Sequence, residues 1–380
     1  MSLEIRDIVF DKTKKTKKAA LYYKTEPFFV NVDNYTHTNN WEILQSIKIL
    51  NHKGFSVDLI DRRNSNWKPE SKYDIFLGLG VGNSGRNFAK HAIISGAPRK
   101  ILLAMGPQPD TSNKRTLKRY EMFKERTGYS APPMRTVEDV VGEKFLDIIE
   151  ATDFIFAIGE EGTPSYNSFL KYDKPVLNFL PSTSSSVKFD NTYLQTRKNN
   201  SFLCFAGNGF ICKGVDLVVE AFLRTPEKEL HICGPSSEKS FFNYYGSKIS
   251  KSPNIKYHGF IKPGGDIFNK LAATCSYVIF HSSSEGCCTS VATSIKAGIV
   301  PIINSWTGIL VENEINGFTL NEKGDIISDI IDTCEAASNI TTEKYNTLVN
   351  GVIKKSKLFS QESFTQSYSK ALDIVLQKQG

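Results

Sequence analysis

Short apolar segments alternate with helix-patterned segments along this 380-residue chain, and this alternation limits the possible folds more than any other feature. Nearly continuous apolar strands that are separated by helices are typical of a parallel sheet covered on both faces. In the first half, five segments have the strand pattern: Pro27–Asp33, Phe55–Ile60, Tyr73–Leu79, Lys100–Ala104 and Phe154–Ile158. Helix-patterned segments lie between them, at 41–52, 86–94, 115–126 and 140–151.

The alternation starts again after residues 181–200, a stretch rich in serine, threonine and asparagine that is typical of an interdomain linker. The second set of strands is expected at Phe202–Ala206, Glu229–Cys233, Ile255–His258, Tyr277–Phe280 and Val300–Ile303. Helices are expected between them, at 215–222, 267–274 and 290–297.

Two sets of alternating elements predict an α/β protein with two Rossmann-like doubly wound domains that face each other across a cleft. The length agrees, because 380 residues exceed one ordinary hydrophobic core. We expect an N-terminal domain over residues 1–185 and a C-terminal domain over 200–358. A last helix, within 360–380, is expected to pack back on the first domain. Ligands of such sheets bind at the carboxyl ends of the strands, which places the expected site in the cleft.

Composition indicates the expected cellular compartment. No window approaches 18 consecutive apolar residues, so no transmembrane helix is expected, and the N-terminus lacks the apolar core of a secretion signal. All seven cysteines follow residue 200, without a CxxC pair or zinc spacing. Most lie in or beside apolar strands, where a thiol acts as a small hydrophobe. We therefore predict a reducing, cytoplasmic location.

The net charge of +7 comes in part from a lysine run between Lys12 and Lys18. Such a run is typical of a solvated or disordered tail, but it is also compatible with weak contact to anionic lipid headgroups or to an acidic substrate. Nucleic acid is not an expected partner, because the sequence has no recognition motif and no aromatic residues are interleaved with the lysines.

A glycine-rich turn follows the first strand of the second half. Its sequence, from Gly207 through Asn208 to Lys213 and Gly214, precedes a helix. Glycines let backbone N–H groups approach an anion, and the helix adds its positive N-terminal end. Lys213 is a cation suited to phosphate. The alternative is a plain strand-to-helix turn with a surface lysine.

A second turn, Ser282–Gly286, follows the strand Tyr277–Phe280 and carries one carboxylate, Glu285. A carboxylate can accept hydrogen bonds from sugar hydroxyls, and free N–H groups at a helix start can bind a phosphate. Glu285 and Thr293 are eight residues apart, so they would share one side of a helix if the helix covered that span. The alternative is an acid that only stabilises the dipole of its own helix.

Six blocks of the second half resemble, in order and spacing, the second domain of the group 1 glycosyltransferases, which have the GT-B fold. The blocks are the turn ending in Lys213-Gly214, L-x-I-x-G-P at 230–235, Y-x-G-F at 257–260, S-x-x-E-G at 282–286, A-G-x-x-P at 297–301 and N-G-F at 316–318. The first half resembles a subset of the family more loosely, through the stretch from His37 to Asp61 and the blocks at 100–140 and 151–169.

The resemblance implies a donor site in the second domain. Lys213 would pair with the donor diphosphate and Glu285 would contact hydroxyls of the transferred sugar, so these two are the candidate catalytic residues. The other implied donor-binding residues are Gly207, Asn208, Phe260, Ile261, Gly286, Cys287, Cys288 and Thr293. Two positions depart from the family pattern: an arginine is frequent where Asn208 stands, and an acid that grips the ribose stands where this chain has Thr293.

On the acceptor side, the resemblance implies that His37, Thr38 and Asn39 lie in a loop that closes over the reacting centre. Family members of this type transfer a sugar with retention of anomeric configuration and need no bound metal. We therefore expect a nucleotide sugar as substrate, a glycan, lipid-linked or small-molecule acceptor, and neither metal nor cofactor. The alternative is a non-catalytic descendant that binds a nucleotide or glycan, because a threonine hydroxyl cannot chelate two ribose hydroxyls as a carboxylate does.

The segment from Gly80 through Gly82 to Gly85 matches the G-x-G-x-x-G pattern of dinucleotide-binding proteins. It lacks an acid at the end of the following strand, so a nucleotide-dependent oxidoreductase is the third hypothesis only. We expect a tight loop whose N–H groups either meet acceptor or donor oxygens or form a simple turn. Arg119, Arg126 and Arg135 are candidates for contact with an anionic acceptor, or else they belong to a solvated helix face.

Overall fold

The computed structural model describes residues 2–30, 38–322 and 324–377, and it divides the chain into two compact units. Unit 1 comprises residues 1–111, 137–182 and 361–380. Unit 2 comprises residues 112–136 and 183–360. Both units are α/β structures built around a mainly parallel sheet, as the alternation of apolar and helical segments predicts.

Within the described residues, the sheet of unit 1 has seven strands in the order β1-β3-β2-β4-β5-β6-β7. Their bounds are β1 Glu4–Ile8, β2 Lys17–Tyr23, β3 Phe55–Asp61, β4 Ile75–Leu79, β5 Lys100–Ala104, β6 Phe154–Ile158 and β7 Val176–Phe179. Only the edge strand β1 runs antiparallel to its neighbour, β3. The central strands β4, β5 and β6 are almost fully apolar because helices cover both of their faces.

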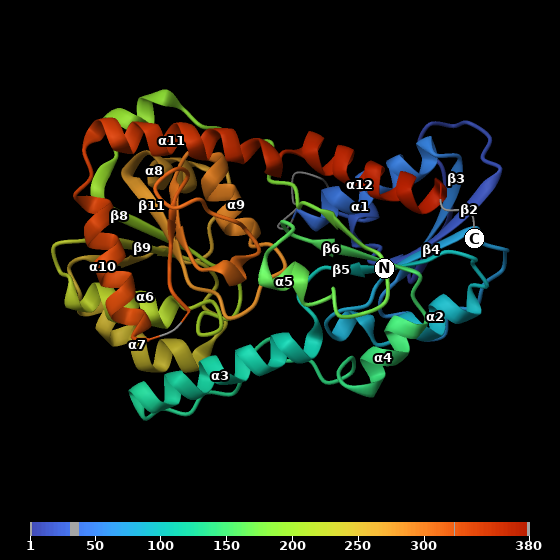
Figure 1. The fold of residues 1–380 in the computed structure, drawn as a ribbon, viewed down its shortest axis with the longest axis horizontal. Coiled ribbons are helices and arrows are strands. Elements are labelled where there is room, and N and C mark those ends of the chain that lie inside the picture. Colours follow the sequence, from blue (N-terminus) through green and yellow to red (C-terminus); the bar gives the residue numbers. More distant parts are fainter. Residues whose placement is uncertain (1, 31–37, 323, 378–380) are drawn as a thin grey trace. The chain divides into compact units, whose positions relative to one another are not determined.

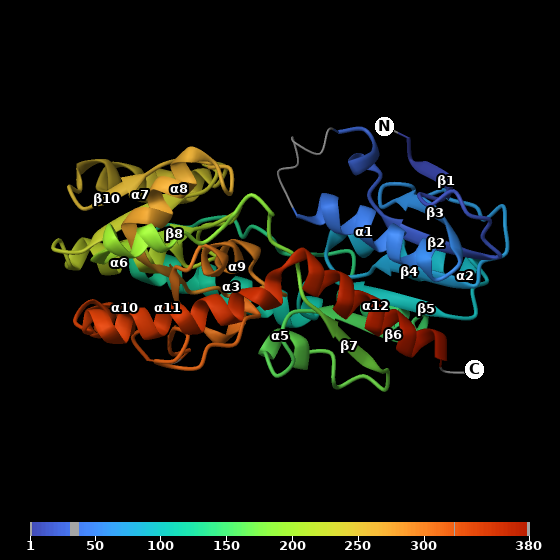
Figure 2. The same ribbon diagram turned by 90° about the horizontal axis from the view of Figure 1, so that it is seen from above.

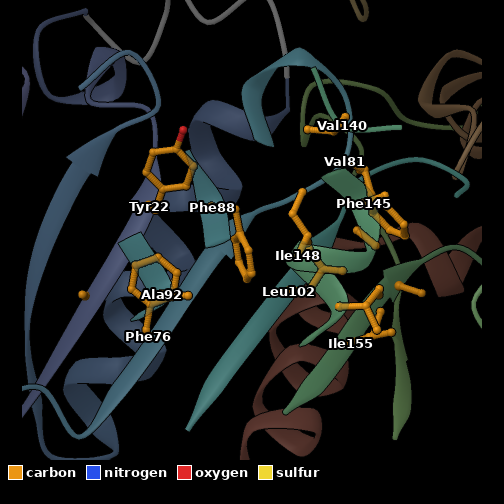
Figure 3. Close-up of a cluster of buried hydrophobic side chains, with 14 of the residues drawn as sticks. Tyr22, Phe76, Val81, Phe88, Ala92, Leu102, Val140, Phe145, Ile148 and Ile155 are labelled. Atoms are coloured by element: carbon orange, nitrogen blue, oxygen red, sulfur yellow. The ribbon is translucent and has the colours of Figure 1, made fainter. Parts of the chain in front are cut away.

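Helices α1 (Asn39–His52) and α12 (Gln361–Gln377) cover one face of this sheet, and α2 (Phe88–Ile94) and α4 (Glu143–Glu150) cover the other (Figures 1 and 2). The second face is closed by a buried cluster that includes Phe76, Phe88, Leu102 and Ile148 (Figure 3). The short helix α5 (Pro164–Asn167) precedes β7. The expected last helix is therefore present and packs with α1 and β7 of unit 1.

Within the described part of the chain, the sheet of unit 2 has six parallel strands in the order β10-β9-β8-β11-β12-β13. The strands are β8 Lys198–Phe205, β9 Glu229–Cys233, β10 Ile255–Tyr257, β11 Cys275–Phe280, β12 Val300–Ile303 and β13 Phe318–Thr319. The helices are α6 Val215–Arg224, α7 Lys239–Lys251, α8 Asp266–Thr274, α9 Thr289–Lys296, α10 Ile326–Ser338 and α11 Thr342–Ser356.

The side chains of β8 show how both faces of this sheet are covered. Leu203 and Phe205 join a buried cluster with Phe268 of α8, whereas Phe202 packs edge-on against Phe222 of α6. Successive strand residues point to opposite faces, so α8 and α6 lie on opposite sides of the sheet. Strands β8 and β11 are parallel neighbours in the middle of this sheet. Their carboxyl ends therefore lie side by side at the same end of the sheet.

Helix α3 (Pro109–Thr127) lies in the first half of the sequence, but from Ser112 onward it packs with unit 2 (Figure 1). The buried ring of Phe123 contacts Tyr244 and Tyr245 of α7, at centroid distances of 5.9 and 6.2 Å. The expected domain bounds, 1–185 and 200–358, thus differ from the observed units at residues 112–136. They also differ at 183–200, where Val187 belongs to the core of unit 2.

Two local expectations were wrong. Of the strand expected at Pro27–Asp33, the structure describes residues 27–30, and these are not a strand: Glu26–Phe28 is a 3-10 helix, and a strand lies earlier, at β2. Residues 31–37 lie outside the described part of the chain. The lysine run is not a disordered tail throughout. Lys18 belongs to β2, where its ammonium lies 3.0 Å from Asp7 and 3.1 Å from Asp58, so its charge is neutralised inside the fold.

We predict that Phe123→Ala destabilises the protein by about 3–5 kcal/mol, the usual cost of removing a buried aromatic ring. Leu117→Ala is the matched control, because Leu117 lies on the same helix but is 49% exposed. Guanidinium unfolding followed by circular dichroism measures both. Equal small losses for the two variants would contradict the packing of α3 on α7.

Candidate functional site

The turn between β8 and α6 is held close to the end of β11. Gly214 has φ +75°, and a Cβ at this position would lie 2.3 Å from the carbonyl oxygen of His281, so the turn requires glycine here. The amide of Ser283 donates to the carbonyl of Cys212 across the same gap, at 2.8 Å. The glycine-rich turn and the turn that carries Glu285 are therefore packed directly on each other.

The turn after β11 is fixed from its other side by the 3-10 helix Ser305–Thr307. The amide of Glu285 donates to the carbonyl of Trp306 at 2.9 Å, and the amide of Cys288 donates to that of Thr307 at 2.8 Å. These bonds orient the Glu285 carboxylate. They also correct one expectation: the Cys288 N–H already has a backbone acceptor and is not a free donor for phosphate.

Three charged side chains meet at the junction of the two turns. The ammonium of Lys213 pairs with Oε1 of Glu285, and Nη1 of Arg135 lies 2.5 Å from the same oxygen. The side chains of Lys213 and Glu285 are 9% and 11% exposed, whereas that of Arg135 is 41% exposed. We call these residues the charge triad; its solvent-facing member is Arg135.

The charge triad keeps Glu285 ionised. Burial alone would raise the pKa of this carboxyl group, but the charges of Arg135 and Lys213 outweigh burial and lower it to about 2. The same ion pair with Glu285 raises the pKa of Arg135. A buried carboxylate that lost either cation would be left poorly compensated, so the three residues stabilise one another.

His281, directly before the turn, has a structural role. Arg119 donates from Nη2 to Nδ1 of His281 at 2.8 Å and from Nη1 to its carbonyl oxygen at 2.9 Å. Because Nδ1 accepts, the proton lies on Nε2, which donates to the carbonyl of Asn321 at 3.1 Å. Burial, together with the charge of Arg119, lowers the pKa of His281 to about 3, so the ring is neutral.

Arg119 and Arg126 are therefore neither on a solvated helix face nor exposed to an acceptor. Arg119 is buried against His281, and Arg126 pairs with the fully buried Asp216 of α6. Both arginines attach α3 to unit 2, and Tyr120 adds a bond to the carboxylate of Glu238.

The other predicted donor residues lie in different surroundings. Gly207 and Asn208 are exposed beside Lys213, and Asn208 accepts a hydrogen bond from Ser237. Phe260 is 60% exposed, but Ile261 belongs to the hydrophobic core, so its side chain does not face a ligand. Gly286, Cys287 and Cys288 lie within the buried turn.

Thr293 does not share a helix face with Glu285. Helix α9 begins at Thr289, so Glu285 lies in the turn before it, and the condition for a shared face is not met. The hydroxyl of Thr293 is buried and donates to the carbonyl of Thr289 at 2.7 Å. Only its acceptor capacity is therefore left for a ligand.

The predicted acceptor-side residues belong to unit 1. His37 lies outside the described residues, while Thr38 and Asn39 begin α1. Gly80 and Gly82 follow β4 in a loop that folds back on itself, since a Cβ on Gly85 would lie 2.5 Å from the carbonyl carbon of Gly80. This crowding gives the glycine pattern a steric explanation that needs no dinucleotide.

Comparison with known proteins adds family evidence to this geometry. Residues 189–336 match the family model of the glycosyl transferases group 1. Residues 189–336 form a group 1 glycosyltransferase domain. This glycosyltransferase domain contains Lys213 and Glu285 of the charge triad, but Arg135 lies outside the matched residues. No curated protein matches the chain.

Solved structures extend the likeness to the whole fold. Sucrose-phosphate synthase from Thermosynechococcus elongatus is 9% identical, with a TM-score of 0.69, over 95% of this chain and 99% of that one. HepE from Anabaena is 12% identical, with a TM-score of 0.62, over 94% and 100%. WaaG, a glycosyltransferase, is 13% identical, with a TM-score of 0.56, over 95% and 100%. The fold is that of the GT-B glycosyltransferases.

None of the helices in residues 2–30, 38–322 and 324–377 has the length and apolar character that crossing a membrane requires. In the same ranges, no group of three or more His, Cys, Asp or Glu residues is arranged to hold a metal ion. All seven cysteines are buried free thiols.

We predict that the charge triad contributes to acid sensitivity. The pKa of Glu285 is depressed in the folded state, so its stabilising effect is present above pH about 4.5 and is lost as pH falls toward about 2. Glu285→Gln should therefore be less stable than the wild type at pH 6, and this difference should narrow as pH falls.

Urea unfolding between pH 6 and pH 3 measures this difference, with Glu121→Gln, an exposed site on α3, as control. A wild-type advantage over Glu285→Gln that stays constant across this range would contradict the assigned ion pairs.

Proposed function

We propose that the protein is a glycosyltransferase that moves a sugar from a nucleoside-diphosphate donor to an acceptor with retention of anomeric configuration. One observation carries the proposal: within the glycosyltransferase domain, a buried lysine and a buried carboxylate meet where two neighbouring strands end. A cation can bind phosphate through charge-assisted hydrogen bonds, and a carboxylate can accept hydrogen bonds from sugar hydroxyls, so the pair fits the diphosphate and the sugar of a nucleotide-sugar donor. Among the similar structures, that of HepE is a complex with UDP and glucose.

In this proposal, Lys213 binds the donor diphosphate and Glu285 binds hydroxyls of the sugar. The exposed turn residues Gly207 and Asn208 and the turn 286–288 line the donor, apart from the occupied Cys288 amide. The exposed ring of Phe260 gives the nucleotide base an apolar surface. Thr293 can offer the ribose one acceptor only, which predicts weaker recognition of the ribose than a carboxylate would give.

The proposed reaction needs no side-chain nucleophile. A bond forms between the acceptor oxygen and the anomeric carbon, and the bond from that carbon to the phosphate oxygen breaks. The leaving phosphate takes the proton of the acceptor hydroxyl, and the charge of Lys213 stabilises the phosphate as its negative charge grows. The proposal assigns no metal and no cofactor to this step.

We place the acceptor with unit 1, at the start of α1 around His37, Thr38 and Asn39 and at the loop of Gly80 and Gly82. The proposed acceptor is a glycan, a lipid-linked sugar or a small molecule. A cytoplasmic location, with weak contact to a membrane surface through the Lys12–Lys18 run, is part of the same proposal. Lys12 and Lys14 are the exposed members of that run that precede β2.

A non-catalytic binding protein is the second candidate. Two observations favour it. The hydroxyl of Thr293 donates its hydrogen bond to a carbonyl within α9, and the carboxylate of Glu285 is already paired with two cations. A protein of this kind would bind a nucleotide without turning it over.

A panel of UDP-, GDP-, dTDP- and CMP-sugars separates the two candidates. We expect release of free nucleotide from at least one donor, with an unchanged anomeric configuration in the product by NMR. Binding of a donor without any release in the presence of varied acceptors would favour the non-catalytic protein.

Lys213→Ala tests the assigned diphosphate contact. We expect it to weaken nucleoside-diphosphate binding by about 1–3 kcal/mol, the range for a lost hydrogen bond to a charged group. Calorimetry measures the affinity, and Lys239→Ala, at the start of α7, is the control. An unchanged affinity would remove Lys213 from the site.

A further inference from the structure

We propose that Arg135 is the second cation of the diphosphate site, supplied by the segment after α3 rather than by the glycosyltransferase domain itself. This inference rests on the proposed function, because it assigns one more residue to the same donor. The glycine-rich turn 207–214 contains a single cationic residue, Lys213, and its exposed residues, Gly207 and Asn208, are neutral. A diphosphate carries at least two negative charges, so one shared ammonium leaves it undercompensated.

The position of Arg135 fits this role. A Cβ added to Gly209 would lie 3.2 Å from Cδ and 3.6 Å from Cγ of Arg135. The aliphatic part of the arginine side chain therefore lies directly against the glycine-rich turn, one residue from Asn208. Its guanidinium group reaches Glu285, which Lys213 also contacts. Arg135 thus spans the distance between the proposed phosphate-binding and sugar-binding groups.

The backbone supports a fixed position for Arg135. Its φ is +67°, in the left-handed region that is unfavourable for a residue with a Cβ. Such a conformation persists when the surrounding structure holds it. The helix that precedes this segment is itself fixed, because Arg119, Tyr120 and Arg126 attach α3 to unit 2 through buried polar contacts.

The exposure of Arg135 distinguishes it from the other members of the charge triad. Its side chain is 41% exposed, against 9% for Lys213, so an arriving anion meets the guanidinium first. A guanidinium group has five N–H donors and can bind a carboxylate and a phosphate oxygen at once. We infer that the donor diphosphate draws Arg135 partly away from Glu285, which releases carboxylate capacity for the sugar hydroxyls.

Arg135→Gln and Asn208→Arg, alone and combined, test this inference as a double-mutant cycle. The probes are UDP, GDP, dTDP, ADP and CDP and their parent nucleosides, titrated by calorimetry. We expect Arg135→Gln to weaken binding of the preferred diphosphate about tenfold and to leave nucleoside binding unchanged. Asn208→Arg should restore most of that loss in the Arg135→Gln background but add less than about threefold to the wild type.

Arg224→Gln, an exposed site at the end of α6, is the control for general charge effects. Circular dichroism shows whether each variant folds. If Arg135→Gln does not fold, Arg135→Lys gives the alternative measurement. This variant keeps the positive charge but loses the paired N–H donors of the guanidinium group. We therefore expect a severalfold loss of affinity for the diphosphate and no change in affinity for the nucleoside.

The outcomes separate this inference from the proposed function. Diphosphate binding that survives Arg135→Gln unchanged overturns the inference and leaves the proposed function standing. A loss that Asn208→Arg does not restore also overturns it, because Arg135 would then act only through the folding of the turn. Failure of every nucleoside diphosphate to bind the wild type overturns the proposed function and the inference with it.

Unit 1 has an arginine-lined pocket that does not involve the charge triad. A pocket of about 450 Å³ lies where β3 and β4 end, and it is lined by three arginines, Arg62, Arg63 and Arg86, with polar side chains of Ser65, Ser84 and Asn87 among its other lining residues. The lining residues, all within the described part of the chain, include no carboxylate. We propose that this pocket binds a phosphate monoester, which within the proposed function belongs to the acceptor.

The pocket is built by specific contacts. The hydroxyl of Tyr22 lies 2.9 Å from the carbonyl oxygen of Arg62 and 2.8 Å from that of Ser84, so its one proton is shared between them and joins the two sides of the pocket. Nη1 of Arg62 donates to Oγ of Ser84 at 2.9 Å. Arg63 is held by Asp61 at 2.6 Å, and the exposed Arg86 lies 3.5 Å from Asp139. The Arg86–Asp139 pair is longer than the Arg63–Asp61 pair, and its carboxylate is much more exposed, so Arg62 and Arg86 carry most of the charge available to an anion.

The test uses the double variant Arg62→Gln/Arg86→Gln, with Lys144→Gln of α4 as control. Glycerol 1-phosphate in solution and vesicles with phosphatidic acid in phosphatidylcholine distinguish a soluble from a lipid source. We expect wild-type binding to at least one of them, a loss of about tenfold or more in the double variant and no change in the control. No binding to either probe, or acetate competing as well as inorganic phosphate, overturns this inference.

Discussion

The Glu285 carboxylate, buried between Lys213 and Arg135, is the interaction on which the candidate site depends. A buried charge is costly unless ion pairs and hydrogen bonds compensate it. Here the compensation comes from two distant parts of the sequence, the turn after β8 and the segment after α3. The charge triad therefore forms only when the two turns of the glycosyltransferase domain and the segment after α3 are all correctly folded.

The same requirement explains why α3 belongs with unit 2. Its contacts with that unit are mostly buried and polar: Arg119 with His281, Tyr120 with Glu238, and Arg126 with Asp216. Removing one partner of such a pair leaves the other unsatisfied, which is more costly than losing an exposed ion pair. Phe123 adds an apolar contact to this polar set. Helix α3, which precedes the segment of Arg135, is thus fixed on unit 2.

Much of the fold could be predicted from the sequence where a strand is buried on both faces. The bounds of β5, β6, β9 and β12 agree with the apolar segments because such strands leave no polar interruption. Strand β2 was missed because it begins with two lysines, and α7, α10 and α11 were not assigned from their mixed polar patterns. The unit to which α3 belongs could not be predicted, since a helical pattern does not identify the surface that covers it.

The candidate site could likewise be predicted only in part from the sequence. Lys213 and Glu285 lie in turns with recognisable sequence blocks, and the structure brings their side chains together. The approach of Arg135 depends on a left-handed backbone and on a contact with residue 285, 150 positions away, and neither has a local sequence pattern. The sequence placed Arg135 among possible anion contacts, but it gave no partner for it.

The charge triad also limits which ligands can separate Glu285 from its two cations. A neutral sugar that displaced Glu285 from its cations would leave Lys213 and Arg135 without a counter-charge. A ligand with a diphosphate next to its sugar supplies that charge at the moment the carboxylate is needed for hydroxyls. In the proposed function, recognition of the sugar is therefore coupled to recognition of the diphosphate, and a free sugar gains little from Glu285 because it cannot meet the electrostatic cost of separating the triad.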